Sequence, residues 1–170
     1  MKNQSAKSVV FTIIALAVLF LSGTFFYIYK LKKTAEPGNE FAESIKWYTY
    51  AEGVPLGKGQ NKKIVLHFYA DWCAFCGKMD KETFRDDPVA VYMNENFIAV
   101  RVNSDREPKL AAEYLVRGLP TTCFLTETGQ KISTLPGYIS PKDFLNFLRF
   151  IYSNSYKSMS FKKFLQHKQI

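Results

Sequence analysis

The chain is poor in the residues that bind metal ions. Of its 170 residues only three are cysteine and two are histidine, whereas structural zinc sites take four ligands, usually Cys and His in paired spacings. Beyond the pair Cys73 and Cys76, the remaining candidates are Cys123, His67 and His167, and none of these is paired at ligand spacing. The sequence therefore predicts no metal site. The alternative, that the protein carries a metal ion, would require a third thiol at the cysteine pair, so Cys123 would have to point towards Cys73 and Cys76.

The sequence also lacks a basic cluster in its central part. The net charge of +8 comes from the two ends, because residues 1–35 carry five lysines and residues 154–170 carry four, with no acidic residue in either segment. Residues 36–153 carry 14 basic and 15 acidic side chains. Nucleic-acid binding needs basic residues gathered on the folded part. We therefore expect no nucleic-acid partner, and we interpret the C-terminal lysines as a solvated tail.

One long apolar run is present, near the amino end. Residues 9–29 hold no charged side chain and have lysines on both sides. A helix of this length spans roughly 30 Å, the thickness of a bilayer core. A cleaved signal peptide is the alternative, but a cut after Gly23 would place Leu21 where a small residue is favoured. We expect an uncleaved single-pass anchor, whose orientation the nearly balanced lysines do not set.

These features divide the chain into five parts. We expect a basic tail at 1–8, a transmembrane anchor at 9–29, a linker at 30–44, a folded domain at 45–152 and a basic C-terminal extension at 153–170. Within the domain, runs rich in β-branched and aromatic residues alternate with helical patterns, which is typical of an α/β sheet.

The element pattern of the domain is specific enough to state residue by residue. The glycine-rich stretch 53–59 predicts a loop with at most one helical turn, because glycine and proline weaken helices. The expected strands are 45–49, 64–70, 97–102, 121–126 and 131–135, and the expected helices are 75–85, 88–93, 108–115 and a last one that follows Ser140 and reaches Ile151.

The cysteines of the CxxC pair stand where thiol chemistry would need them. The strand at 64–70 runs directly into Asp71, Trp72 and Cys73, so Cys73 falls at the start of the next helix. Unpaired backbone N–H groups and the positive end of the helix dipole lower the pKa of a thiol in that position. Cys76 follows one turn later on the same face, where it can attack a mixed disulfide on Cys73 and release the partner.

Two other interpretations of the pair follow from its spacing. Zinc sites use the same spacing, and the two cysteines can also form a purely structural disulfide. A disulfide that closes so short a loop restricts the unfolded chain little. The spacing therefore favours redox chemistry over a structural disulfide.

Two separate motifs in this sequence resemble one family. The string YADWCAFC at 69–76 resembles the active-site segment of thioredoxin-like proteins, and RGLPT at 117–121 resembles the cis-proline loop of the same fold. The resemblance covers about 45–151 and is similar to the carboxy-terminal domain of the membrane thiol reductase DsbD and to membrane-tethered, SoxW-type thioredoxins. It implies an α/β thioredoxin fold, a central mixed sheet flanked by helices, here with one N-terminal transmembrane helix.

The resemblance also implies a role for several residues. Cys73 would be the nucleophile and Cys76 the resolving thiol. Leu119 and Pro120, joined by a cis peptide bond, would lie beside the pair and offer backbone polar groups to an extended substrate. Trp72 would shield the thiols and help to dock partners, or it is simply a half-buried aromatic residue.

A cellular setting follows from the same resemblance. The protein would be a thiol–disulfide oxidoreductase of the bacterial inner membrane, with its thioredoxin domain in the periplasm. Its partners would be protein thiols and disulfides and an upstream membrane electron donor, and it would need no cofactor besides the Cys73–Cys76 disulfide. The similarity to a reductase favours electron donation to oxidised partners.

Several positions depart from the family pattern. His67 stands six residues before Cys73, where thioredoxins usually carry a buried aspartate. It is either a core histidine satisfied by a backbone group or the proton acceptor for Cys76, since an imidazole titrates near neutral pH. The dipeptide Ala74-Phe75 replaces Gly-Pro between the cysteines, and this dipeptide tunes the redox potential, so the direction of electron flow is not readable from it.

Two further side chains receive no chemical role from the sequence. Cys123 lies in an apolar strand, where a free cysteine behaves as a small buried hydrophobe. Arg101 is interpreted as an ordinary solvated arginine.

The alternative function is that of a non-catalytic adaptor or chaperone that binds partner chains at the cis-proline groove. Such adaptors often lose one cysteine, whereas this chain has both.

Overall fold

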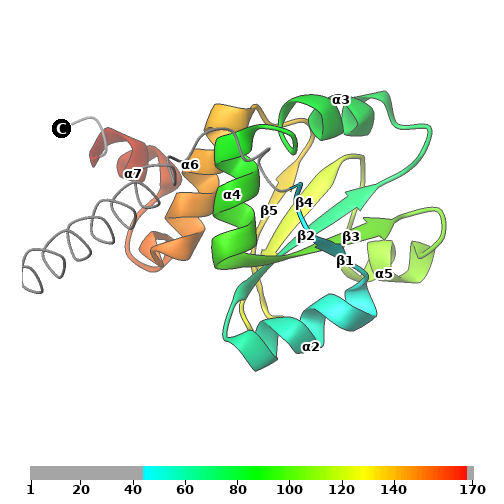
Figure 1. Cartoon of the computed structure of the whole chain (residues 1–170), viewed down its shortest axis with the longest axis horizontal. Coiled ribbons are helices and arrows are strands. Elements are labelled where there is room, and N and C mark those ends of the chain that lie inside the picture. Colours follow the sequence, from blue (N-terminus) through cyan, green and yellow to red (C-terminus); the bar gives the residue numbers. More distant parts are fainter. Residues whose placement is uncertain (1–43, 168–170) are drawn as a thin grey trace, which may run out of the picture. The chain divides into compact units, whose positions relative to one another are not determined.

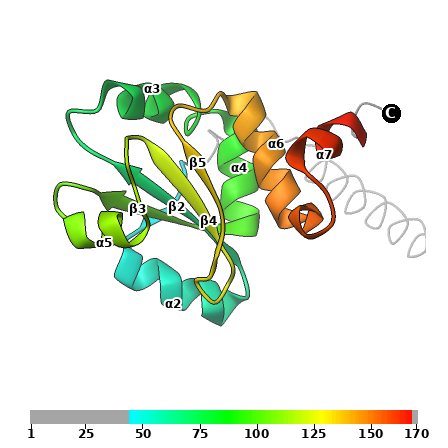
Figure 2. The same cartoon turned by 180° about the vertical axis from the view of Figure 1, so that it is seen from behind.

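The computed structural model describes residues 44–167 (Figures 1 and 2). The predicted tail and anchor, and the linker up to residue 43, lie outside the described residues, as do residues 168–170. Between residues 44 and 167 no helix is both long enough and apolar enough to cross a bilayer. The anchor at 9–29 therefore stays a prediction.

Five strands form one mixed sheet in the order β1-β3-β2-β4-β5. The strands β1, β3 and β2 run parallel, whereas β4 is antiparallel to both β2 and β5. The predicted mixed sheet is confirmed, with strand ends within two residues of the predicted ones. The bounds are β1 Trp47–Tyr48, β2 Lys63–Tyr69, β3 Phe97–Asn103, β4 Thr121–Leu125 and β5 Lys131–Pro136.

Helices cover both faces of the sheet (Figures 1 and 2). Alternate side chains of β2 point to opposite faces: Val65 packs with α4 and α6, whereas Ile64 and Leu66 pack with α2 and α5. Because both faces are buried, the centre of β2 is apolar without the polar alternation of a half-exposed strand. The bounds are α2 Tyr50–Gln60, α3 Ala74–Glu82, α4 Asp87–Asn96, α5 Pro108–Glu113, α6 Pro141–Tyr152, the 3₁₀ turn η1 Ser155–Lys157, and α7 Phe161–His167.

The predicted loop at 53–59 is wrong, because the stretch belongs to α2. Thr49 and Glu52 form a reciprocal capping box at its start, which satisfies two backbone N–H groups that a helix leaves open. Glycines that weaken an isolated helix serve here to bring α2 close to the sheet. A Cβ at Gly53 would collide with Val100, and one at Gly57 would lie 2.8 Å from Ile64.

The chain beyond α6 folds back onto that helix. The ring of Phe161 in α7 lies 4.9 Å from that of Phe147 and 5.4 Å from that of Phe150, measured between ring centroids. Lys162 and Lys163 of the same helix are exposed. The segment predicted as a solvated tail is thus amphipathic, and its aromatic residues cover α6.

Candidate active site

The cysteine pair joins the end of β2 to the start of α3. The Cys73 N–H donates to the Ala70 carbonyl at 3.2 Å, and Cys73 is the N-cap residue of α3. Cys73 and Cys76 form a disulfide with their Cα atoms 5.2 Å apart. Cys73 is 7% exposed and Cys76 only 1%, so the outer sulfur is the one that a partner can reach.

The local backbone is arranged to hold negative charge on the outer sulfur. The N–H of Cys76 donates to Cys73 Sγ at 3.1 Å. Unpaired N–H groups and the dipole at a helix start favour an anion there. If the disulfide opens, a thiolate on Cys73 keeps a donor already directed at it.

The loop before β4 lies beside the pair. The Leu119–Pro120 peptide bond is cis, and Leu119 packs on the small cluster of Ala70, Cys73 and Cys76. The Pro120 carbonyl accepts a hydrogen bond from Gly137 N–H at 2.7 Å. This bond ties the loop to the end of β5 and keeps it next to the disulfide.

Two aromatic side chains next to the disulfide face solvent. Trp72 is 73% exposed and Phe75 is 62% exposed, so Trp72 is not the half-buried residue of the alternative interpretation. The Trp72 indole N–H donates to Asp105 Oδ2 at 2.8 Å. This hydrogen bond orients the ring, most of whose surface is exposed to solvent. Next to Cys73 lies an open hollow of about 460 Å³, lined by Asp71, Trp72, Cys73, Ala74, Gly77, Lys78, Lys81 and Glu82.

His67 is completely buried in β2. Its Nδ1 pairs with the hydroxyl of Thr122 at 3.0 Å, a side-chain partner rather than the expected backbone group. Its ring packs edge-on against Phe84 at 4.8 Å between centroids. Burial, with a smaller contribution from the Arg101 guanidinium, lowers the pKa of His67 to about 3. The imidazole is therefore neutral at neutral pH and a weak base there.

An ion pair beneath α3 was missed by the sequence interpretation. Arg101 Nη2 lies 2.6 Å from Asp80 Oδ2, and the Arg101 side chain is only 25% exposed, so it is not an ordinary solvated arginine. Its guanidinium stacks 4.0 Å from the centroid of the Tyr69 ring, a favourable cation–π contact. Asp80 follows Cys76 by four residues, which puts both on one face of α3. This four-residue spacing was the signal in the sequence that could have pointed to Asp80.

Three buried polar atoms near this ion pair have no hydrogen-bond partner among the described residues. They are His67 Nε2, Asp80 Oδ1 and Arg101 Nε. His67 and Arg101 are partners in the β2–β3 register, and Asp80 pairs with Arg101 from α3. This part of the molecule thus holds a neutral imidazole and a carboxylate with acceptor capacity left over.

Cys123 lies away from the pair. It packs in the cluster on the α2 and α5 face, with Leu66 and Tyr114, and burial raises the pKa of its thiol. A metal carrier would need this thiol at the CxxC pair, and the fold directs it elsewhere. Between residues 44 and 167 no group of three or more His, Cys, Asp and Glu side chains could hold a metal ion.

Comparison with known proteins gives matches over this same region. The sequence profile of a family described as a thioredoxin-like domain matches residues 56–152. The thiol:disulfide interchange protein DsbD of Actinobacillus pleuropneumoniae serotype 5b is 35% identical over 99 residues, which make up 55% of this chain and 17% of that protein. The DsbD of Haemophilus ducreyi is 34% identical over 94 residues, 52% of this chain and 16% of that protein. The chain thus matches only a small part of these relatives.

Solved structures share the fold. A thioredoxin from Thermus thermophilus superposes with a TM-score of 0.59 at 26% identity, covering 64% of this chain and 88% of that one. A DsbH oxidoreductase superposes with a TM-score of 0.56 at 20% identity, covering 75% of this chain and 99% of that one.

Proposed function

The chain belongs to the thioredoxin-like domain family, and from this premise we propose that it is a thiol–disulfide oxidoreductase that acts on protein partners through Cys73 and Cys76. The observation that carries the proposal is the position of Cys73 as N-cap of α3, with its sulfur accepting from Cys76 N–H at 3.1 Å. A structural disulfide would not need this donor.

The proposed reaction proceeds in two exchanges. The Cys73 thiolate attacks a partner disulfide, so that one partner sulfur leaves as a thiolate and a mixed disulfide forms. Cys76 then loses its proton and attacks Cys73 Sγ, and the second partner sulfur leaves. The partner gains two electrons, and the protein ends with the Cys73–Cys76 disulfide, which is the form seen in the structure.

Partner chains would dock on the surface around the disulfide. The exposed rings of Trp72 and Phe75 supply apolar area, and the cis Leu119–Pro120 loop packs beside the disulfide. Solvent-facing aromatic residues at such a site favour binding because they bury a large area when a partner covers them.

For the direction of electron flow we propose donation to oxidised partners. The support is the match to DsbD. Known members of the fold range from about −270 to about −120 mV. A midpoint potential of the Cys73–Cys76 couple at the thioredoxin end of this range would agree with the proposal, and one at the oxidising end would reverse it.

We further propose that residues 9–29 anchor the protein in a bacterial inner membrane, with the domain in the periplasm and an upstream membrane electron donor. The support is the uncharged run of membrane-spanning length between lysines. Labelling of the reduced Cys73 by a membrane-impermeant maleimide in spheroplasts tests this placement. Labelling only after lysis would contradict it.

Replacement of the nucleophile tests the catalytic proposal. We expect wild-type protein to catalyse reduction of insulin by dithiothreitol and Cys73→Ser to lose at least about 1,000-fold, because serine is not a nucleophile towards disulfides at neutral pH. Cys123→Ser is the matched control and should leave the rate unchanged, since that thiol lies on the other face of the sheet. Equal rates for wild type and Cys73→Ser would contradict the catalytic proposal and support the alternative adaptor function. The exposed rings of Trp72 and Phe75 are also consistent with an adaptor.

A further inference from the structure

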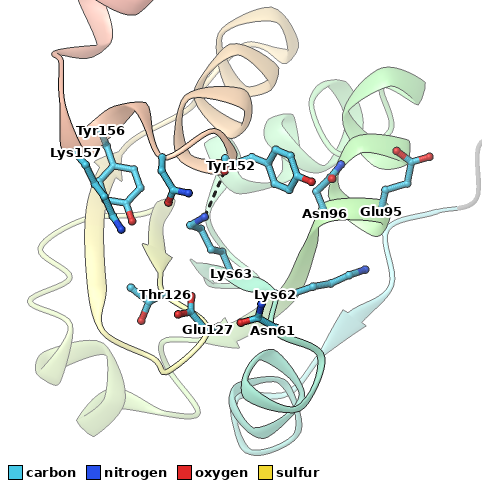
Figure 3. Close-up of a pocket in the computed structure, with 11 residues that line it drawn as sticks. Asn61, Lys62, Lys63, Glu95, Asn96, Thr126, Glu127, Tyr152, Tyr156 and Lys157 are labelled. Atoms are coloured by element: carbon cyan, nitrogen blue, oxygen red, sulfur yellow. Dashed lines mark hydrogen bonds between the residues drawn. The ribbon is translucent and has the colours of Figure 1, made fainter.

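A second cavity lies at the opposite end of β2 from the cysteine pair. It opens where β2 begins at Lys63, whereas the disulfide follows the end of this strand at Tyr69. Its volume is about 390 Å³, within the usual range for small-molecule sites. Unlike most such sites, it is polar (Figure 3), lined by Asn61, Lys62, Lys63, Glu95, Asn96, Thr126, Glu127, Tyr152, Asn154, Tyr156 and Lys157.

One wall of this cavity comes from the C-terminal extension. Asn154, Tyr156 and Lys157 follow the family match, which ends at residue 152. The segment is held in place by the packing of α7 on α6. The cavity is therefore a feature of this chain and not of the family domain by itself.

Two of the three lysines are engaged with helix ends. Lys62 Nζ donates to the Asn94 carbonyl at 3.3 Å near the end of α4, and Lys63 Nζ donates to the Tyr152 carbonyl at 3.4 Å at the end of α6. Such contacts compensate the negative ends of helix dipoles. The ammonium of the third, Lys157, donates no hydrogen bond within the described part of the chain.

The cavity therefore contains side-chain hydrogen-bond donors that have no acceptor within residues 44–167. Besides the Lys157 ammonium, the side-chain amides of Asn61 and Asn154 and the hydroxyl of Tyr156 make no hydrogen bond among residues 44–167. These groups come from two different walls, the α2–β2 junction at Asn61 and the extension from Asn154 to Lys157; Asn61, Tyr156 and Lys157 are labelled in Figure 3. A ligand that accepts hydrogen bonds in several directions fits this arrangement.

The charges favour an anion between Lys63 and Lys157. Burial and the Lys157 ammonium lower the pKa of Lys63, while Glu127 acts in the opposite direction. No lysine of this cavity lies within ion-pair distance of Glu95 or Glu127 in the part of the chain that the structure describes. A bound anion would relieve the repulsion between the two ammonium groups.

We propose that this cavity binds a phosphate group, held between Lys63 and Lys157 and by the neutral donors Asn61, Asn154 and Tyr156. Phosphate fits better than a carboxylate because it offers at least three acceptor oxygens in a tetrahedral arrangement, whereas a carboxylate offers only two oxygens in one plane. The group belongs either to a free phosphate monoester or to a lipid headgroup.

The test is an NMR titration of the full chain in a zwitterionic detergent, observing the amides of Asn154 and Lys157. With inorganic phosphate or glycerol phosphate we expect saturable shifts with a Kd of about 1 mM or tighter. Lys157→Met should weaken binding about tenfold, and Lys109→Met, an exposed lysine of α5 away from the cavity, should not change it. The proposal is overturned if neither inorganic phosphate, glycerol phosphate nor dihexanoyl phosphatidylglycerol saturates by about 10 mM, or if the Lys157→Met variant binds with unchanged affinity.

Three further experiments make the assignment specific. Glu127→Gln removes the carboxylate that competes for Lys63 and should tighten phosphate binding severalfold. Acetate binding as tight as phosphate binding would overturn the choice of phosphate. Saturable binding of dihexanoyl phosphatidylglycerol but not of glycerol phosphate assigns the group to a lipid headgroup, and the reverse assigns it to a free monoester.

Discussion

At the residue scale, His67 shows how burial decides the chemistry of a titratable group. Its type and position suggest a proton acceptor for Cys76, because a free imidazole titrates near neutral pH. In the fold it is hydrogen-bonded to Thr122, and complete burial, with a smaller contribution from the Arg101 cation, lowers its pKa to about 3. A base this weak is poorly matched to a thiol at neutral pH.

The lowered pKa of His67 predicts a specific acid instability. The unfolded chain protonates this side chain near pH 6.5, but the folded protein does so only near pH 3. The unfolded state therefore binds more protons between these values, and the free energy of unfolding falls as the pH falls. Between pH 6.5 and 4, wild type should lose about 3 kcal/mol more than His67→Gln, as measured by urea unfolding. Equal pH slopes for the two proteins would contradict this.

Asp80 is a second residue whose surroundings only the fold reveals. Its carboxylate pairs with Arg101 at 2.6 Å and still has one buried oxygen without a partner. Asp80 follows Cys76 by four residues on α3, which puts the two side chains on one face of that helix.

Loss of the Asp80–Arg101 pair should be costly because Arg101 is three-quarters buried. We expect Asp80→Asn to lower the free energy of unfolding by about 2 kcal/mol, since the guanidinium is left without its partner. Glu113→Gln in α5 is the control, because this exposed carboxylate makes no ion pair or side-chain hydrogen bond within residues 44–167. It should cost less than about 0.5 kcal/mol. Equal losses in thermal or urea unfolding would show that the buried pair is not stabilising.

At the element scale, α2 is where local preference and tertiary packing disagree. Three glycines and Pro55 lie within its 11 residues, and each disfavours a helix in isolation. Gly53 and Gly57 are buried against Val100 and Ile64, so the close approach of α2 to the sheet depends on the missing side chains. The burial gained across this contact outweighs the low helix preference.

Replacement by alanine should have opposite effects on the free energy of unfolding at Gly53 and at Gly59, two glycines of α2. At Gly53 a methyl group collides with Val100, so Gly53→Ala should lower the free energy of unfolding by about 2 kcal/mol or more. At Gly59 nothing lies within 4 Å, so Gly59→Ala should raise it by about 0.5 to 1 kcal/mol through helix preference alone. Urea unfolding of both variants measures this. A similar effect of the two substitutions would mean that α2 does not pack as described.

At the scale of the whole molecule, the C-terminal extension completes the core on the α6 side. Phe147 and Phe150 are 6% and 5% exposed, and rings of α7 lie against both. Phe164 adds a contact to Phe150 at 5.4 Å between centroids. Without α7, two aromatic side chains of α6 would face solvent. The extension thus has a structural role besides providing a wall of the second cavity.

Removal of one of these rings should weaken the molecule without changing its redox chemistry. We expect Phe161→Ala to lower the free energy of unfolding by about 2 kcal/mol, less than for a fully buried phenylalanine because the ring is only partly buried. Lys162→Ala, its exposed neighbour, should change it by less than about 0.5 kcal/mol. The midpoint potential of the cysteine pair should be equal in both variants. A Phe161→Ala protein as stable as Lys162→Ala would leave the extension without a part in the core.

Much of the fold could be predicted because its signals are local. The apolar runs of β2 and β3 and the Ser140 cap of α6 are readable from neighbouring residues, since strand burial and helix capping act over a few positions. The CxxC pair is readable for the same reason: its position between a strand and a helix is a property of consecutive residues. The cis-proline loop was recognised by resemblance and not from physical pattern.

The sequence by itself determined the alternation of strands and helices and the placement of Cys73 at a helix start, because those features depend on residues close together in the chain. Only the tertiary structure decided that Gly53 lies inside a helix, that His67 is a weak base, that Arg101 is paired with Asp80, and that the C-terminal lysines flank packed rings. Each of these depends on groups far apart in sequence. Burial, pKa and ion pairing are set by distances in space, and the order of the residues does not contain those distances.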